Sequence, residues 1–185
     1  MEIDPVKASR VRLVALDVDG VLTDNGIWIG TVAGERVELK RFDIQDGLGM
    51  RLLSTAGIPL IWVSGRHSEA TALRAAELRV DELLQVPGPE KLAALSELLS
   101  RRGLAWDAVA YVGDDLADLQ VMRRAGLPIA VANAVPEIRA VADGVTRAPG
   151  GHGAVREIAD ALLKARGVWP EMLERYFTEP ARRDV

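Results

Sequence analysis

The stretch VRLVALDVDGVLTD at residues 11–24 joins an apolar run to a turn that carries three carboxylates. The run from Val11 to Leu16 has the length and composition of a strand that is buried on both faces of a parallel sheet. The turn starts at Asp17 and includes Gly20, which allows the backbone to bend sharply. Because open parallel sheets bind ligands beyond the carboxyl ends of their strands, this turn is a candidate functional site.

The rest of the chain repeats the alternation of short apolar runs with longer amphipathic stretches. Further core strands are expected at residues 60–63, 109–112 and 129–132. Helices are expected at residues 47–56, 68–78, 89–102, 115–125, 135–142 and 154–165. The alternation predicts an α/β fold with a three-layer α/β/α, Rossmann-like parallel sheet.

One segment breaks this alternation. The β-prone runs at residues 27–29 and 37–42 flank a glycine-containing stretch that suits a turn, so we expect a β-hairpin that projects after the first strand. The intervals from Asp24 to Ile61 and from Arg66 to Lys91 are too short to hold a cap domain. The sequence therefore predicts a single domain over residues 1–185, with its core at about 10–167 and a short tail at 168–185.

The composition limits the chemistry that the protein can use. The chain has no cysteine, so a disulfide scaffold, a thiolate metal site and a cysteine nucleophile are excluded. The formal net charge of -4 argues against a nucleic-acid-binding surface. No apolar run approaches the ~20 residues that a membrane span needs, and we expect a cytoplasmic protein.

Carboxylates follow two of the predicted strands. Asp17 and Asp19 share one turn, and their negative charges repel unless a cation lies between them. Gly113-Asp114-Asp115 follows the strand at 109–112, so one of its carboxylates can complete the coordination of that cation. Hard oxygen ligands of this kind favour Mg²⁺. Taken alone, either segment could instead be an Asp-rich turn that caps a helix.

A hydroxyl and an ammonium group complete the candidate set. Ser64 follows the strand at 60–63, where it could begin an anion-binding loop or simply cap a helix. Lys91 lies in the first turn of a helix, where the helix dipole disfavours a cation, although most lysines are solvated surface residues. Together with the carboxylates, these groups are the ones that phosphoryl transfer requires.

In chain order, these segments closely resemble the four motifs of the haloacid dehalogenase-like superfamily of phosphohydrolases. The resemblance implies that Asp17 is the nucleophile and becomes an aspartyl-phosphate, and that Asp19 is the general acid and base. It implies that Asp17, the backbone carbonyl of Asp19 and Asp114 hold Mg²⁺. Asp115 would support them nearby.

The same resemblance assigns the remaining site residues. Ser64 and Lys91 would grip the phosphoryl oxygens. Among the members without a cap domain, the chain is most similar to phosphatases of eight-carbon keto-acid sugar phosphates, with nine-carbon, sialic-acid-type substrates as the alternative. Residues implied to bind the sugar are Arg66, Asp43, Asp46 and Thr23. Arg66 is a candidate for binding the keto-acid carboxylate, and Asp46 is an equally good N-cap for the helix at 47–56.

A site without a cap must accept a large substrate or take its walls from a neighbouring subunit. The predicted hairpin and the apolar tail are the candidate donors, so we expect a homo-oligomer, with a homotetramer as the favoured form. Two rival functions are a receiver-like phosphoacceptor module and a non-catalytic relative. Asp19 argues against the receiver, since a receiver needs no acid for a leaving group. The full set of implied catalytic residues argues against the non-catalytic relative.

Overall fold

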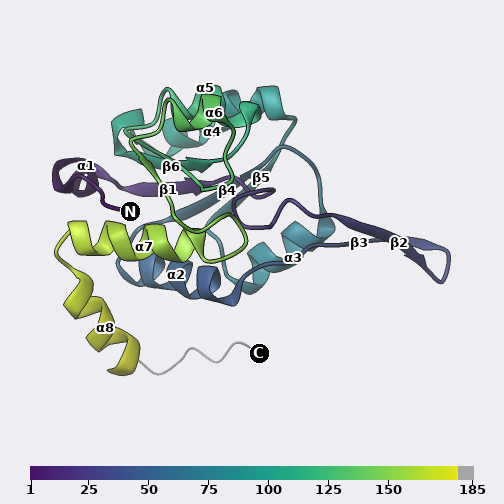
Figure 1. The fold of residues 1–185 in the computed structure, drawn as a ribbon, viewed down its shortest axis with the longest axis horizontal. Helices are drawn as coiled ribbons and strands as arrows, with labels where there is room; N and C mark the ends of the chain where they lie inside the picture. Colours follow the sequence, from purple (N-terminus) through teal and green to yellow (C-terminus); the bar gives the residue numbers. More distant parts are fainter. Residues whose placement is uncertain (179–185) are drawn as a thin grey trace.

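The structure, a computed structural model, describes residues 1–178 and is built around a six-stranded parallel sheet (Figure 1). The strand order is β5-β4-β1-β6-β7-β8. The bounds are β1 Leu13–Leu16, β4 Leu60–Ser64, β5 Glu82–Gln85, β6 Val109–Gly113, β7 Leu127–Ala130 and β8 Gly144–Val145. The expected α/β fold is confirmed.

Helices cover both faces of the sheet and give the three expected layers (Figure 1). One layer holds α2 (Ile44–Thr55), α3 (Glu69–Glu77) and α7 (Ala154–Ala165), and the other holds α4 (Lys91–Arg102), α5 (Leu119–Met122) and α6 (Pro136–Arg139). Every residue of β1, β4, β6 and β7 is buried, as strands between two helical layers must be. The remaining elements are α1 (Pro5–Arg10), α8 (Trp169–Thr178) and the 3-10 turns Gly88–Glu90, Trp106–Ala108 and Leu116–Asp118.

The expected hairpin is present and projects away from the body of the molecule (Figure 1). Strands β2 (Trp28–Val32) and β3 (Glu35–Leu39) pair antiparallel around a two-residue turn at Ala33 and Gly34, both with positive φ. A bridge between Thr23 and Phe42 closes the base of the hairpin. In the described part of the chain, the hairpin, α2, α3 and β5 fill the two intervals that were judged too short for a cap domain.

Several predicted boundaries are wrong for identifiable reasons. The first long helix begins at Ile44 rather than 47, because Asp43 caps it by accepting a hydrogen bond from the Gln45 N–H. Strand β7 begins at Leu127 and so includes Pro128, which has no N–H to donate. Strand β8 pairs only with Ile129 and Ala130, so the missing N–H costs no hydrogen bond between β7 and β8. The helices expected at 115–125 and 135–142 shrink to four residues each, the first of them preceded by a 3-10 turn.

The two ends of the chain add helices that the sequence pattern did not predict. Residues 5–10 form α1, capped by Asp4, and the apolar tail forms α8, which buries Met172 against the body. Residues 179–185 of the predicted tail lie outside the described part of the chain. Among the helices of residues 1–178, none combines the length and the apolar character that crossing a bilayer demands.

Candidate active site

The strand order places the first acidic turn at a switch point of the sheet. From β1 the chain crosses to β4 on one side, and from β5 it returns to β6 on the other side of β1. The carboxyl ends of β1 and β6 therefore flank the crevice in which open α/β sheets bind ligands. Leu16 is in register with Val112, so Asp17 and Asp114 emerge from adjacent strands at the same edge.

Three carboxylates converge at this edge. One oxygen each from Asp17, Asp114 and Asp118 lies within 4.8 Å of the others, and all three side chains are buried. Burial raises the pKa of Asp17 well above its usual range, and the nearby charge of Asp118 raises it further. Burial, followed by the same neighbouring charge, raises the pKa of Asp114 to about 6. The cluster is therefore costly to ionise without a cation.

Lys91 supplies one positive charge to this cluster. Its Nζ lies 2.5 Å from Oδ1 of Asp17 and 2.8 Å from Oδ1 of Asp118, with the side chain almost fully buried. Burial alone would favour the neutral amine, but the two carboxylates hold the pKa of Lys91 above its usual value. The surface interpretation of this lysine is thus wrong. One ammonium leaves two of the cluster's negative charges uncompensated, which suits a divalent cation.

Asp118 is a site residue that the sequence analysis missed. It accepts hydrogen bonds from Lys91, from the hydroxyl of Tyr111 (2.6 Å) and from the Asp114 N–H (3.1 Å). In the sequence it stands four residues after Asp114, but the short 3-10 turn that folds it back toward the cluster has no clear sequence signal. Asp115, in contrast, is exposed and caps that turn by accepting from the Leu116 N–H.

Ser64 is the last residue of β4, and Arg66 lies in the loop that follows. The Ser64 hydroxyl is buried and bonds within the loop, donating to the Arg66 carbonyl at 2.9 Å and accepting from the Arg66 N–H at 3.3 Å. The Arg66 guanidinium points to the hairpin, where it makes a bidentate pair with Glu38 at 3.0 and 2.8 Å. Glu38 was not predicted, because it is distant in sequence and belongs to no recognisable motif.

Asp19 also has a partner from the hairpin segment. The Nζ of Lys40 lies 2.6 Å from Oδ1 of Asp19, and the Lys40 side chain is fully shielded from solvent. The predicted general acid is therefore held by an unpredicted lysine. In the printed sequence, Lys40 is one of many basic residues, and only the fold of the hairpin brings it to the site.

The expectations for Thr23 and Asp46 need correction. Thr23 is fully buried, and its hydroxyl accepts from the Gly20 and Asn25 N–H groups, so it closes the acidic turn instead of facing a substrate. Asp46 is neither a pocket residue nor the cap of α2. It is 1% exposed and accepts from the N–H groups of Gly153 and Arg156, which caps α7 across the helix pair.

Asp43 lies near the surface, beside the packed helices α2 and α7. It caps α2, and its carboxylate lies 3.7 Å from Arg41. The Arg41 guanidinium in turn donates to the Gly151 carbonyl at 2.6 Å. Asp43 is thus placed beside the glycine-rich loop at 150–153, and its side chain keeps 19% of its exposure.

The glycine-rich loop packs directly behind the acidic turn. The Gly151 N–H donates to the Val21 carbonyl at 3.0 Å. Asn133 joins the two segments, because it donates to the Gly20 carbonyl at 3.0 Å and accepts from the Gly150 N–H at 2.7 Å. A side chain at Gly20, which has φ +95°, would overlap Oδ2 of Asp114. Glycine is therefore required where the two acidic segments approach each other.

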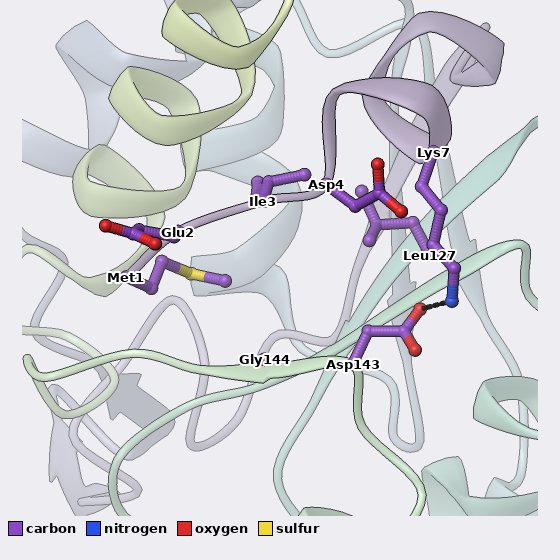
Figure 2. A pocket seen from close by; sticks show the side chains of 8 residues that line it. All are labelled: Met1, Glu2, Ile3, Asp4, Lys7, Leu127, Asp143 and Gly144. Atoms are coloured by element: carbon purple, nitrogen blue, oxygen red, sulfur yellow. Dashed lines mark hydrogen bonds and ion pairs between the residues drawn. The ribbon is translucent and has the colours of Figure 1, made fainter.

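A separate cavity of about 190 Å³ lies at the opposite end of the sheet, where the N-terminal segment meets the starts of β7 and β8 (Figure 2). Lys7 and Asp143 form an ion pair there at 2.6 Å. Its lining residues are Met1, Glu2, Ile3, Asp4, Lys7, Leu127, Asp143 and Gly144. Because ligand sites of open sheets lie at the carboxyl ends, we assign the chemistry to the acidic cluster instead.

Comparison with known proteins agrees with this site. The family model described as haloacid dehalogenase-like hydrolase matches residues 82–158, the segment that contains Lys91, Asp114 and Asp118. The chain is 47% identical over 161 residues to the 3-deoxy-D-manno-octulosonate 8-phosphate phosphatase KdsC of Escherichia coli strain K12, covering 87% of this chain and 84% of the relative.

Solved structures are similar over nearly the whole chain. The Moraxella catarrhalis 3-deoxy-D-manno-octulosonate 8-phosphate phosphatase, in complex with magnesium, phosphate and KDO, matches with a TM-score of 0.87 and 39% identity, covering 93% of this chain and 97% of that one. The cobalt-bound phosphatase from Haemophilus influenzae matches with a TM-score of 0.81 and 33% identity, covering 91% and 99%.

The fold and the site together define a haloacid dehalogenase-like hydrolase, and residues 1–178 contain no cap domain. The sequence identity to the relatives extends over most of both chains and points to one family within this class of hydrolases. The chain belongs to the family of 3-deoxy-D-manno-octulosonate 8-phosphate phosphatases.

Proposed function

We propose that the protein is a Mg²⁺-dependent phosphatase that hydrolyses 3-deoxy-D-manno-octulosonate 8-phosphate to the free sugar acid (KDO) and phosphate. The observation that carries the proposal is the buried cluster of Asp17, Asp114 and Asp118 around Lys91 at the switch point of the sheet. Membership of the phosphatase family supports the reaction, and the complex of the Moraxella protein with magnesium, phosphate and KDO supports the substrate and the ion.

The proposed reaction has two displacements at phosphorus. A carboxylate oxygen of Asp17 attacks the phosphorus atom and the bond to the sugar oxygen breaks, which leaves an aspartyl-phosphate. Asp19 gives a proton to the departing sugar oxygen. Asp19 then takes a proton from a water molecule whose oxygen attacks the phosphorus, and the bond to Asp17 breaks. The products are the sugar acid with a free hydroxyl group and inorganic phosphate, and the enzyme returns to its original state.

The donor set fits Mg²⁺. Carboxylate oxygens of Asp17 and Asp114 and the backbone carbonyl of Asp19 would hold the ion, since Mg²⁺ prefers hard oxygen ligands. When bound, the ion offsets negative charge on the transferring phosphoryl group. Lys91 reaches the nucleophile directly, so its ammonium is placed to bind a phosphoryl oxygen, and Ser64 supplies a hydroxyl from the neighbouring strand end.

Arg66 is the proposed contact for the carboxylate of the keto-acid sugar. Its bidentate pairing with Glu38 supports this role, because the same planar geometry suits the carboxylate of a ligand. A third of the Arg66 side chain is still exposed, which leaves room for a second carboxylate. Asp43, at the edge of the glycine-rich loop, is the proposed contact for the sugar hydroxyl groups.

We also propose that the single-domain subunits assemble as a homotetramer. The support is the hairpin, which exposes Trp28, Ile29, Val32 and Leu39, an unusual set of large apolar side chains for a free surface. Sedimentation at micromolar concentration should give the tetramer mass, and Ile29→Lys should reduce it. A fully active wild-type monomer would contradict the assembly. The cytoplasmic location stays a prediction.

The function is tested by a panel of phosphomonoesters ranked by kcat/KM, with and without Mg²⁺. The panel contains the octulosonate 8-phosphate, a nonulosonate 9-phosphate and glucose 6-phosphate. We expect the octulosonate ester to rank first, no turnover without a divalent ion, and no turnover in Asp17→Asn. Preference for the nonulosonate would replace the substrate, and an active Asp17→Asn variant would remove the nucleophile. A stable phosphoprotein without turnover would favour the receiver.

A further inference from the structure

Asp19, the proposed general acid and base, forms an ion pair with Lys40. Lys40 lies outside the four sequence motifs. It follows β3 at the base of the hairpin, and its Nζ lies 2.6 Å from Oδ1 of Asp19. Its side chain has no solvent exposure, whereas that of Asp19 keeps 21%. Burial of a charged ammonium group costs free energy, and most lysines therefore remain exposed. The burial of Lys40 indicates a specific role.

Lys40 is fixed from three directions. Besides the pair with Asp19, its Nζ donates to the hydroxyl of Thr71 in α3 at 3.1 Å and lies 3.9 Å from Oε1 of Glu38. Thr71 is itself fully buried, and its N–H is held by the Ser68 hydroxyl. The ammonium therefore has a fixed position set by α3 and the hairpin, and it presents that position to the acidic turn.

The contact selects one oxygen of Asp19. Oδ1, the atom that faces Lys40, is buried, although the side chain as a whole is partly exposed. The accessible part of the carboxylate is therefore the part away from Lys40, which leaves Oδ2 to meet a substrate. Proton transfer requires the carboxyl oxygen to lie within hydrogen-bond distance of the leaving oxygen. The orientation of the Asp19 carboxyl group therefore matters as much as its presence.

We propose that Lys40 is a positioning residue for Asp19: it holds Oδ1 so that Oδ2 faces the leaving oxygen of the phosphate ester. The inference rests on the proposed function, in which Asp19 is the general acid. Lys40 acts through Asp19 and has no contact of its own with the reacting atoms.

Strand β3, which directly precedes Lys40, extends the arrangement to the sugar-binding side. Glu38 lies two residues before Lys40 and so projects to the same side of the extended chain. Its carboxylate binds the Arg66 guanidinium, and Oε1 also accepts from the Ser68 hydroxyl at 2.7 Å. The base of the hairpin thus positions both the acid and the arginine, in addition to any role that the exposed tip has in assembly.

The leaving group provides a test that a general loss of structure would not mimic. A sugar phosphate needs a proton on its leaving alkoxide, whereas p-nitrophenolate departs without one. The quantity to measure is kcat/KM, because it reports the steps up to formation of the phosphoenzyme. In Lys40→Met, we expect kcat/KM for the sugar phosphate to fall about tenfold or more beyond any fall for p-nitrophenyl phosphate.

Three variants make the test specific. Lys40→Arg keeps the charge but displaces it, so its selective loss should be smaller, and it replaces Lys40→Met if the latter does not fold. Arg36→Met removes a charge from the exposed part of β3, the strand that precedes Lys40, and should leave both rates unchanged. In an Asp19→Asn background, Lys40→Met should have no further selective effect, because both substitutions impair the same proton transfer from Asp19 to the leaving oxygen.

The outcomes separate this inference from the function on which it rests. Wild-type protein that hydrolyses neither ester overturns the phosphatase function and the role of Lys40 together. If the wild type is active but Lys40→Met loses the same factor with both esters, or loses nothing with the sugar phosphate, the positioning role alone is overturned. A selective loss that persists in the Asp19→Asn background also overturns it.

Discussion

Lys91 lies between two buried carboxylates, 2.5 Å from Oδ1 of Asp17 and 2.8 Å from Oδ1 of Asp118. The lysine begins α4, whereas the aspartates follow β1 and β6, so one side chain joins three separate segments. Because all three groups are buried, each depends on the others for its charge state. The same ammonium therefore contributes to the stability of the fold and to the proposed binding of phosphate.

Lys91→Met should weaken both. Removing one partner of a buried ion pair costs about 3–5 kcal/mol, because it leaves uncompensated charge. We expect a loss of this order in the unfolding free energy at pH 8, measured by urea denaturation, and a fall of roughly 10²-fold or more in kcat/KM. Lys7→Met, which breaks the partly exposed pair with Asp143, should cost about 1 kcal/mol or less. Equal losses in the two variants would contradict the role of Lys91.

Magnesium should stabilise the metal-free protein even without substrate. Asp17, Asp114 and Asp118 repel one another in the buried cluster, and a divalent cation relieves that repulsion only in the folded state. At a hundredfold excess over Kd the gain is about 2.7 kcal/mol, enough to raise Tm by several degrees. Differential scanning fluorimetry should detect this rise in the wild type and in Asp143→Asn, but not in Asp114→Asn. A rise of equal size in Asp114→Asn would place the ion elsewhere.

The sequence predicted the parts of the site that depend on local pattern. Asp17, Ser64 and Asp114 each follow an apolar run, and the ends of parallel strands necessarily meet at one edge. Lys91 was found through its unfavourable place in a helix. The family resemblance then assigned roles that composition and spacing alone left open.

The residues that were missed reach the site through tertiary structure. Lys40 and Glu38 are ordinary residues of an exposed hairpin until the base of the hairpin packs on α3. Asp46 has the position and residue type of a helix cap, and it does cap a helix, but the helix is α7, more than a hundred residues away. Such contacts between distant segments have no signature in a single sequence, because residue type and periodicity report only local structure.

Asp46 should make the stability of the fold depend on pH. Burial raises its pKa to about 6, although the N–H groups of Arg156 and Gly153 favour its charged form. The folded protein therefore binds this proton more tightly than the unfolded chain, in which an aspartate has a pKa near 3.9. The stabilisation from the proton is fully present below about pH 4 and is lost as the pH rises through about 6.

Asp46→Asn isolates this contribution, because asparagine does not titrate. As the pH is raised from 4 to 7, the unfolding free energy of the wild type relative to the variant should fall by about 2–3 kcal/mol. Urea denaturation at both pH values measures the difference, and subtraction removes the titration of the other groups. A difference that stays constant, or that grows with pH, would show that the buried carboxylate is not protonated preferentially in the folded state.

Gly150 should tolerate no side chain, because it lies against the acidic turn. An added Cβ would overlap the carbonyl oxygen of Gly20, next to Asp19, and Asn133 bonds to both glycines. Gly150→Ala must displace one of the two segments, at a cost of about 1–3 kcal/mol for forced overpacking. We expect a lower Tm together with a lower kcat, since the displaced turn carries both Asp17 and Asp19.

Gly30→Ala is the matched control for this variant. Gly30 lies in the hairpin, its φ is not positive, and a Cβ added there would meet nothing within 4 Å in the subunit, so alanine should lower Tm and kcat far less than Gly150→Ala does. Both variants can be compared by thermal unfolding and by hydrolysis of the same phosphate ester. If Gly150→Ala keeps wild-type stability and rate, the glycine-rich loop does not press on the acidic turn, and its close packing there has no bearing on the position of the nucleophile.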